Sequence, residues 1–222
     1  MRAFSPLTVI LLLVALIAPL SGASAANIAY HNKEYGWTIA YPDDWMVIER
    51  KSAFVALMPP DSMPGVVTIS SARADFGSLE ELADNVDVVR IATFAQRHLT
   101  YTVLSRTHGA LADGTPYIET EYRTSNNNEA LHWRERSFLL RSTAFVLVAD
   151  TFTDMWVVLD PAFEAILDTF EPNGALAFAA GQCAPRGTLC GAPLQWIGVD
   201  QLARHATALQ ARTVPNISPS SP

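Results

Sequence analysis

The sequence lacks the motifs by which most hydrolases, nucleotide-binding proteins and metalloproteins are recognised. It has no G-x-S-x-G, which serine hydrolases place at a strand-to-helix turn, and no Gly-rich loop of the kind that binds phosphates or dinucleotides. The five histidines form neither H-x-x-x-H, H-x-H nor H-E-x-x-H, and the haem-attachment motif C-x-x-C-H is absent. These absences predict a protein without a metal centre or a bound cofactor.

Positive charge is scarce as well. Fifteen Lys and Arg residues stand against 22 Asp and Glu in a chain of 222 residues. Removal of an N-terminal signal would take away Arg2 alone, which leaves a formal charge of 14 − 22 = −8. An acidic protein offers no electrostatic attraction to nucleic-acid phosphates or to anionic lipid. We therefore expect neither nucleic acid nor a membrane surface as a partner.

Residues 1–25 have the pattern of a secretory signal peptide. Arg2 supplies a positive n-region, Val9–Ala18 is an unbroken apolar run, and Ala23-Ser24-Ala25 fits the small-x-small cleavage site. No cysteine lies near that site, which argues against a lipoprotein anchor. The apolar run is about half of the ~20 residues that span a bilayer, so cleavage is favoured over retention of the segment as an anchor. The prediction is an exported protein, periplasmic or secreted, with no stable membrane insertion.

Cysteine occurs at only two positions, Cys183 and Cys190, both within CAPRGTLC. In an oxidising compartment such a close pair predicts a local disulfide, because a metal site would need further His or Cys ligands nearby. The pair lies in a C-terminal extension, residues 173–222, that is rich in Gly, Ala and Pro. The extension ends in PNISPSSP, a composition typical of disorder. Within it, Val199–Arg212 is a candidate for a short amphipathic helix.

The stretch GWTIAYPDDW, residues 36–45, raises a choice between chemistry and structure. Trp37, Ile39 and Tyr41 alternate with smaller residues, which predicts a strand with one bulky buried face. The PDD that follows has turn chemistry, because proline fixes φ and aspartate bonds back to the backbone. Two adjacent aspartates are only a fragment of the six or more oxygens that calcium takes. We therefore interpret the stretch as an opening hairpin with solvated turn aspartates.

Strand and helix patterns along residues 26–172 follow the order of one α+β domain. Ser78-Leu79-Glu80-Glu81 is a capping box that starts a helix through about Gln96, and Asp160-Pro161 has the N-cap and first-turn residues of a closing helix. Ala144–Phe152 is continuously apolar, which predicts a central strand covered on both faces. The other predicted strands are Phe54–Met58, Val66–Ala72, Tyr101–Thr107, Pro116–Thr124 and Leu131–Leu140. Few strand–helix–strand crossovers occur in this order, so an antiparallel sheet is predicted rather than a doubly wound parallel one.

The opening hairpin, G-[aromatic]-x-[aliphatic]-x-Y-P-x-x-W, resembles that of the PsbP/Mog-like superfamily. This superfamily includes the photosystem II extrinsic protein PsbP and DcrB-like bacterial exported proteins. FVALMPP resembles its second hairpin, SLEELADNV its first helix, and FVLVADTF with FEAILDTFEP its last strand and closing helix, over about residues 28–172. The resemblance implies an antiparallel sheet flanked by helices in an α-β-α sandwich. It implies binding or accessory roles and no shared catalytic residues, and the chain departs from it after residue 172.

Three carboxylates in the later strands are the candidates for chemistry. Glu119 and Glu121 share one face of a strand, with Glu135 predicted across from them on the next strand. Glycosidases use two carboxylates about 5–9.5 Å apart, so a carboxylate-based hydrolase or a small-ligand site on this face is the alternative function. Arginines interleave with these glutamates, and cross-strand ion pairs explain the pattern at least as well.

The segments TEYR and HWRERSF, residues 120–123 and 132–138, place arginines and aromatic residues on neighbouring strands. Arg, Tyr and Trp are enriched at interface hot spots. If no helix covers this face of the sheet, the face is the predicted partner surface; the alternative is an ordinary salt-bridged sheet surface. The predicted partner surface consists of Tyr122, Arg123, Trp133, Arg134 and Arg136. The predicted function is that of a non-enzymatic exported protein, a protein-binding or accessory factor of an envelope or secreted complex.

Overall fold

The computed structural model describes residues 27–49, 54–60, 63–126, 130–172 and 189–190. The described helices are α2 (Leu79–Gln96) and α3 (Trp156–Leu167). The described strands are β1 (Asn27–Asn32), β2 (Trp37–Pro42), β3 (Met46–Glu49), β4 (Phe54–Met58), β5 (Val66–Ala74), β6 (Thr100–Ala110), β7 (Pro116–Ser125), β8 (Ala130–Leu140), β9 (Thr143–Phe152) and β10 (Leu189–Cys190).

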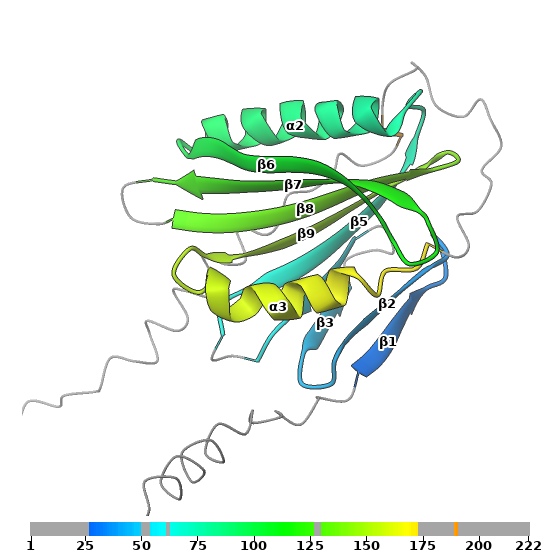
Figure 1. Cartoon of the computed structure of the whole chain (residues 1–222), viewed down its shortest axis with the longest axis horizontal. Helices are drawn as coiled ribbons and strands as arrows, with labels where there is room; N and C mark the ends of the chain where they lie inside the picture. The colour runs from blue at the N-terminus through cyan, green and yellow to red at the C-terminus, as the bar shows by residue number, and fades with distance from the viewer. Residues whose placement is uncertain (1–26, 50–53, 61–62, 127–129, 173–188, 191–222) are drawn as a thin grey trace, which may run out of the picture.

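The strands form one large antiparallel sheet and one two-stranded sheet (Figure 1). The large sheet has the order β3-β4-β5-β9-β8-β7-β6, and the short β10 pairs with β5. α2 packs on one face of this sheet and α3 on the other, and we call these faces the α2 face and the α3 face. β9 lies between β5 and β8 and is almost entirely buried, as predicted for residues 144–152. The predicted α+β class and α-β-α sandwich are confirmed.

The opening stretch is structural. β2 places Trp37, Ile39 and Tyr41 in the core of the α3 face, with Trp45 beside them after the turn. The ring of Trp45 meets that of Phe163 on α3 edge-on, with centroids 6.2 Å apart. The two aspartates of the turn are exposed, as predicted. Burial of each such aromatic side chain contributes on the order of 2–3 kcal/mol, so this hairpin anchors one layer of the domain.

Hydrogen bonds fix the small sheet, β1 with β2, against the rest of the domain. The Trp37 indole Nε1 donates to Ser71 Oγ of β5 at 2.9 Å. Thr38 and Glu171 exchange two backbone hydrogen bonds, of 2.9 and 2.8 Å, which join β2 to the segment after α3. Because these contacts link residues far apart in sequence, the N-terminal hairpin and the C-terminal end of the domain stabilise each other.

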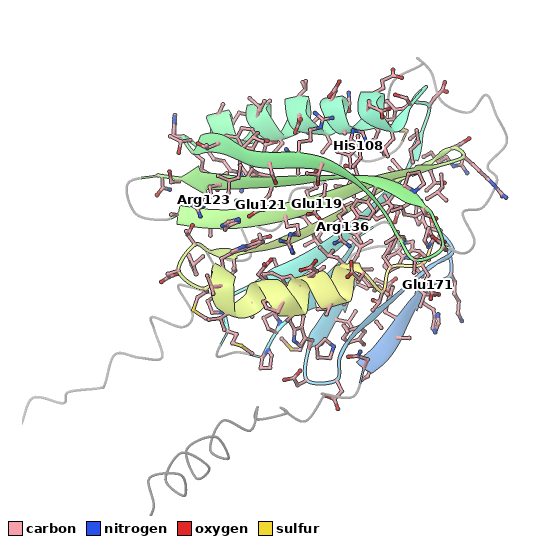
Figure 2. The ribbon with its side chains drawn as sticks, in the orientation of Figure 1. His108, Glu119, Glu121, Arg123, Arg136 and Glu171 are labelled. Carbon is pink, nitrogen blue, oxygen red and sulfur yellow. The ribbon has the colours of Figure 1, made fainter. Side chains whose placement is uncertain are left out.

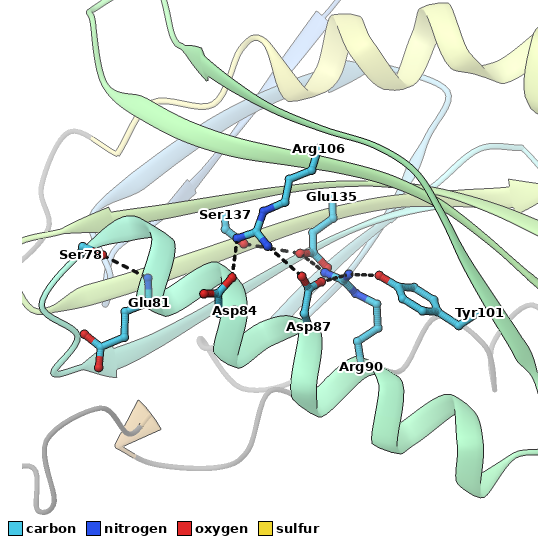
Figure 3. Close-up of polar contacts among 9 residues, drawn as sticks. All are labelled: Ser78, Glu81, Asp84, Asp87, Arg90, Tyr101, Arg106, Glu135 and Ser137. Carbon is cyan, nitrogen blue, oxygen red and sulfur yellow. Dashed lines mark hydrogen bonds and ion pairs between the residues drawn. The ribbon is translucent and has the colours of Figure 1, made fainter.

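The capping box at the start of α2 is present (Figure 3). The Glu81 backbone N–H donates to Ser78 Oγ at 3.1 Å, and the Glu81 carboxylate accepts from the Gly77 backbone N–H at 2.6 Å. Leu82 and Val86, about one turn apart on the helix, are fully buried against the sheet. One turn further on the same side lies Arg90, a fully buried arginine that the sequence pattern did not predict.

The predicted start of the closing helix was wrong. α3 begins at Trp156, with Met155 at the N-cap, and Pro161 lies inside the helix. Asp160 does not cap the helix, because its carboxylate pairs with Arg134 of β8 at 2.8 Å. The helix ends at Leu167, and Phe170 reaches the core from the turn that follows.

Several predictions concern residues outside the described part of the chain. These are the signal peptide at residues 1–25, the Cys183 half of the predicted disulfide and the candidate helix Val199–Arg212. Cys190 is described as backbone only, where β10 pairs Leu189 with Ala74 and Cys190 with Arg73. Among the residues that the structure describes, neither helix is long and apolar enough to cross a bilayer.

Replacing Ser78 with Ala tests the capping box. The substitution removes the acceptor of the Glu81 N–H and should lower the free energy of unfolding by about 1 kcal/mol. A loss of this size lowers the melting temperature by roughly 2–4 °C in a chain of this length. The matched control is Ser105→Ala on β6, where no helix begins and a change within about 0.5 kcal/mol is expected. Equal losses in the two variants would contradict a specific role for the cap.

Candidate functional site

Alternation along β7 and β8 sends neighbouring side chains to opposite faces of the sheet. On the α2 face, Tyr122 lies opposite Trp133. On the α3 face, Glu119 lies opposite Arg136 and Glu121 opposite Arg134. Since side chains on a strand alternate with a period of two, the aromatic pair and the two ion-paired rows lie on opposite faces of the sheet.

The residues of the predicted partner surface therefore lie on two opposite faces of the sheet, and the prediction needs correction. Tyr122 and Trp133 lie beneath α2 with exposed fractions of 0 and 2%. Their rings stack at 5.7 Å, and the indole Nε1 of Trp133 donates to Thr124 Oγ1 at 2.9 Å. These two aromatic residues are core residues of the α2 face, so a partner cannot contact them in the folded protein.

The three arginines of the predicted surface lie on the α3 face, but only Arg123 is exposed. Arg136 is buried between Glu119 of β7 and Asp168 after α3, with Nε and Nη1 each 2.7 Å from a carboxylate oxygen. Arg134 pairs with Asp160 of α3 at 2.8 Å. The last two arginines thus join α3 to the sheet.

The predicted carboxylate face is also divided. Glu135 lies opposite Thr120 on the α2 face, whereas Glu119 and Glu121 lie on the α3 face. Glu135 is 2% exposed and pairs with the fully buried Arg90 of α2. The sheet separates the third carboxylate from the other two, so the three cannot act on one substrate.

Arg90 is the centre of a buried polar network that sequence analysis missed (Figure 3). Its guanidinium pairs with Asp87 on α2 and Glu135 on β8, and donates to the Tyr101 hydroxyl at 2.6 Å. It also lies 4.4 Å above the ring of Tyr122. Burial raises the pKa of Glu135, although the neighbouring guanidinium opposes this shift. The network joins α2 to three strands from inside the domain, which makes it structural.

A second missed group is Asp150 on β9, a fully buried carboxyl. It faces the α2 side of the sheet, in register with Trp133 and Val66. Neither of its oxygens has a hydrogen-bond partner among the described side chains and backbone. Burial alone raises its pKa well above the ordinary value of an aspartate. The only signal in the sequence was an acidic residue near the end of a continuously apolar strand.

His132 of β8 is held by three contacts on the α3 face. Its Nε2 lies 2.6 Å from Glu121 and its Nδ1 accepts a 3.3 Å hydrogen bond from Arg123 Nε. The imidazole stacks on Trp156 of α3 with centroids 3.9 Å apart and planes 5° apart. Because an arginine N–H can only donate, Nδ1 carries no proton, and the Nε2 proton points at Glu121. Burial lowers the pKa of His132, and the contact with Glu121 offsets this only in part.

These contacts define what the cluster can do chemically. Both ring nitrogens of His132 are engaged, so it has no free lone pair with which to act as a general base. Its contacts instead hold the guanidinium of Arg123, the exposed end of the cluster, on the surface of the α3 face. Figure 2 shows Arg123, Glu121 and Glu119 side by side along β7 on this face, above α3 in the view. In the described part of the chain, no group of three or more His, Cys, Asp or Glu side chains is arranged to hold a metal ion.

Replacing Arg90 tests the buried network. Arg90→Met leaves Glu135 buried without its cation and should cost about 3–5 kcal/mol in the free energy of unfolding. The double variant Arg90→Met/Glu135→Leu removes both charges and should be more stable than the single one, as measured by urea denaturation. Arg106→Met is the control, because Arg106 makes more exposed ion pairs with Asp84 and Asp87, worth up to about 1 kcal/mol. Equal losses for the two single variants would rule out the network as an anchor of α2.

His132 should make stability depend on pH. The folded protein favours the neutral ring. As pH falls, His132 is therefore protonated in the unfolded chain, at the ordinary histidine pKa of about 6.5, before it is protonated in the folded protein. Above that pH His132 does not change the free energy of unfolding. Below it the free energy of unfolding should fall as the pH drops toward the lowered pKa of His132 in the folded state. His132→Gln should flatten the profile below about pH 6.5, as measured by denaturant unfolding at each pH. A parental slope in His132→Gln would disprove this assignment.

Comparisons with known proteins place this fold. No protein-family model matches the chain, and no curated protein matches it in sequence. The solution structure of cyanobacterial PsbP (CyanoP) from Synechocystis sp. PCC 6803 is similar, with a TM-score of 0.55 at 16% identity over 70% of this chain and 98% of that one. LpqN of Mycobacterium tuberculosis, described as involved in cell envelope biogenesis, has a TM-score of 0.42 at 14% identity over 68% of this chain and 86% of its own. The similarity to CyanoP confirms the fold that the resemblance of the opening hairpin implied: the chain has a PsbP-like fold.

Proposed function

We propose that this chain is an exported, non-enzymatic protein that acts by binding another protein. Its binding surface is the part of the α3 face that α3 leaves uncovered, and we call it the open face. α3 packs on β9 and β2, whereas β6 and β7 lie at the far side of the sheet (Figure 1). The open face consists of Ser105 and Thr107 on β6 and Glu119, Glu121 and Arg123 on β7.

The observation that carries the proposal is the positioned guanidinium of Arg123. Its Nε is held by His132, and no carboxylate pairs with it among the described residues. The other two arginines of this face are engaged by carboxylates of β7 and α3. An arginine that is fixed in place but not neutralised suits recognition of a carboxylate on a partner, because the guanidinium binds it with two parallel hydrogen bonds.

Two further observations support a binding role rather than catalysis. The N-terminal 25 residues predict export, and the chain lacks the motifs of common enzyme classes. The one histidine of the α3 face cluster uses both ring nitrogens in fixed contacts. The carboxylate-hydrolase alternative loses Glu135, which lies on the opposite face of the sheet. Of the two carboxylates that remain together, Glu119 is paired with Arg134 and Arg136, and Glu121 lies against His132. A PsbP-like fold constrains the shape and leaves the role to the surface.

Site-specific photo-crosslinking tests this function. A photoreactive phenylalanine analogue replaces Thr107, on the open face, or Lys33, which is exposed between β1 and β2. The expected result in native envelope or culture fluid is one defined adduct from position 107 and none from position 33. Arg123→Glu should reduce that adduct at least tenfold, because it places a negative charge where the partner's carboxylate binds.

The control variant is Arg141→Glu, an exposed arginine in the turn between β8 and β9 that reverses the same charge elsewhere. It should leave the adduct at position 107 unchanged. Equal adducts from positions 107 and 33, or an adduct that survives Arg123→Glu, would contradict binding through the open face. Turnover of a substrate that a single polar substitution abolishes would contradict the non-enzymatic role.

A further inference from the structure

The two edges of the large sheet differ in length and in protection. β3, at one edge, has four residues, whereas β6, at the other, has eleven and pairs only with β7 among the described strands. The outer backbone N–H and C=O groups of an edge strand are available for pairing with another chain. Natural edge strands are blocked by shortness, by Lys or other charges, by Pro or by bulges. β6 is long and contains no Lys or Pro, its Arg106 turns toward α2, and its bulge lies before Ser105.

One bulge interrupts β6, and a regular segment follows it. The register with β7 shifts between Val103 and Ser105, which leaves Leu104 without a cross-strand partner and 44% exposed. From Ser105 to Ala110 the pairing with β7 is continuous. Six residues in extended conformation give an edge of about 20 Å, which is long enough for one added strand.

The α2 side of this edge is apolar at one end. Arg106 of β6 pairs with Asp84 at 2.9 Å and Asp87 at 3.1 Å, so this side of α2 borders β6 (Figure 3). Ile91 follows Asp87 by four residues and therefore lies on the same side of the helix. Ile91, Val103 and Leu104 are all about half exposed. A strand added to β6 would extend the sheet past this apolar group.

Charge decides which chain fits there. Glu80 and Asp84 are exposed on the α2 side, and Glu119 and Glu121 lie on the open face one strand in from the edge. Arg106 is shared between Asp84 and Asp87 on the α2 side. On the other side Arg134 and Arg136 pair with Glu119 but also with carboxylates of α3 and of the turn after it. Carboxylates therefore outnumber arginines on both sides of the edge. A second copy of this chain would bring the same carboxylates against each other, which disfavours self-association through β6. A segment that carries Lys or Arg between apolar residues is complementary to both sides of the edge.

We propose that β6 binds an extended basic segment of another protein as an additional strand along Ser105–Ala110. The inference rests on the proposed function, since it assigns the backbone edge beside the open face as the place where the partner docks. Main-chain hydrogen bonds supply the affinity in this mode, and alternate side chains supply the selectivity. Apolar residues of the segment pack toward Val103, Leu104 and Ile91, and its basic residues lie near the carboxylates.

Peptide binding to the full-length exported protein tests the mode of docking. The probe is a fluorescent nine-residue peptide in which Val and Lys alternate, and binding is followed by fluorescence anisotropy. Two peptides of equal length serve as controls: one with Glu in place of Lys, and one with alternate backbone nitrogens methylated. Each control should bind at least tenfold more weakly, a difference of about 1.4 kcal/mol. An N-methylated peptide that binds as tightly as the parent would overturn strand addition.

Hydrogen exchange locates the peptide on the protein. Every second backbone amide from Ser105 to Ala110 should exchange more slowly when the Val/Lys peptide is bound, because only the outward-facing amides gain partners. Leu104→Asn should weaken binding several-fold, whereas Val157→Asn, an exposed valine on α3, should not change it. Protection elsewhere, or equal effects of the two substitutions, would refute the assignment.

Two outcomes separate this inference from the proposed function. If the crosslink from position 107 depends on Arg123 but no β6 amide gains protection, the partner binds the open face without adding a strand. A concentration-dependent dimer in sedimentation that Leu104→Asn abolishes would assign the edge to a second copy of this chain and overturn the choice of partner.

Discussion

Coverage of a wide sheet by narrow helices is the constraint on which the architecture depends. Seven strands spaced about 4.8 Å apart make a sheet roughly 30 Å wide, whereas one helix with its side chains is about 10 Å across. On the α3 face, α3 and the β1–β2 hairpin lie next to each other and bury the half of the sheet around β4, β5 and β9. β6 and β7 remain beyond their reach, which is why that part of the face carries charged and hydroxyl side chains.

The ion pairs of the α3 face follow from this partial coverage. At the margin of α3, Arg134 and Arg136 connect the sheet to the carboxylates of the helix, Asp160, and of the turn after it, Asp168. At the first residue of α3, Trp156 stacks on His132 of the sheet. Beneath α2 the ion pair is fully buried, because Arg90 lies with Glu135 inside the domain. Two charges removed from water are tolerated only as a well-bonded pair. One sheet thus carries a partly solvated polar layer on one side and a desolvated polar centre on the other.

Local patterns predicted the elements well, and they could not predict which layer covers each face. The capping box placed Ser78 correctly, and the alternation of β2 identified its buried face, because both signals depend on adjacent residues. Tyr122 and Trp133 were assigned to a surface since alternation gives two faces but does not say which one a helix covers. Arg90 was missed because an arginine in a helix is ordinarily solvated. Asp160-Pro161 wrongly predicted the start of a helix, because Asp160 pairs with Arg134 on β8 and does not cap α3.

The alternation of β7 and β8 has a consequence for how the hairpin between them can change. A slip of β7 by one residue would turn Glu119 and Glu121 into the space beneath α2 and would move Tyr122 to the α3 face. Burying these carboxylates without their arginine partners costs too much free energy for the slipped pairing to form. Insertions in the strands themselves should therefore be accepted during evolution only in twos or as bulges. Insertions in the connecting turn are free of this parity rule, which makes the turn the natural position for variation among related chains.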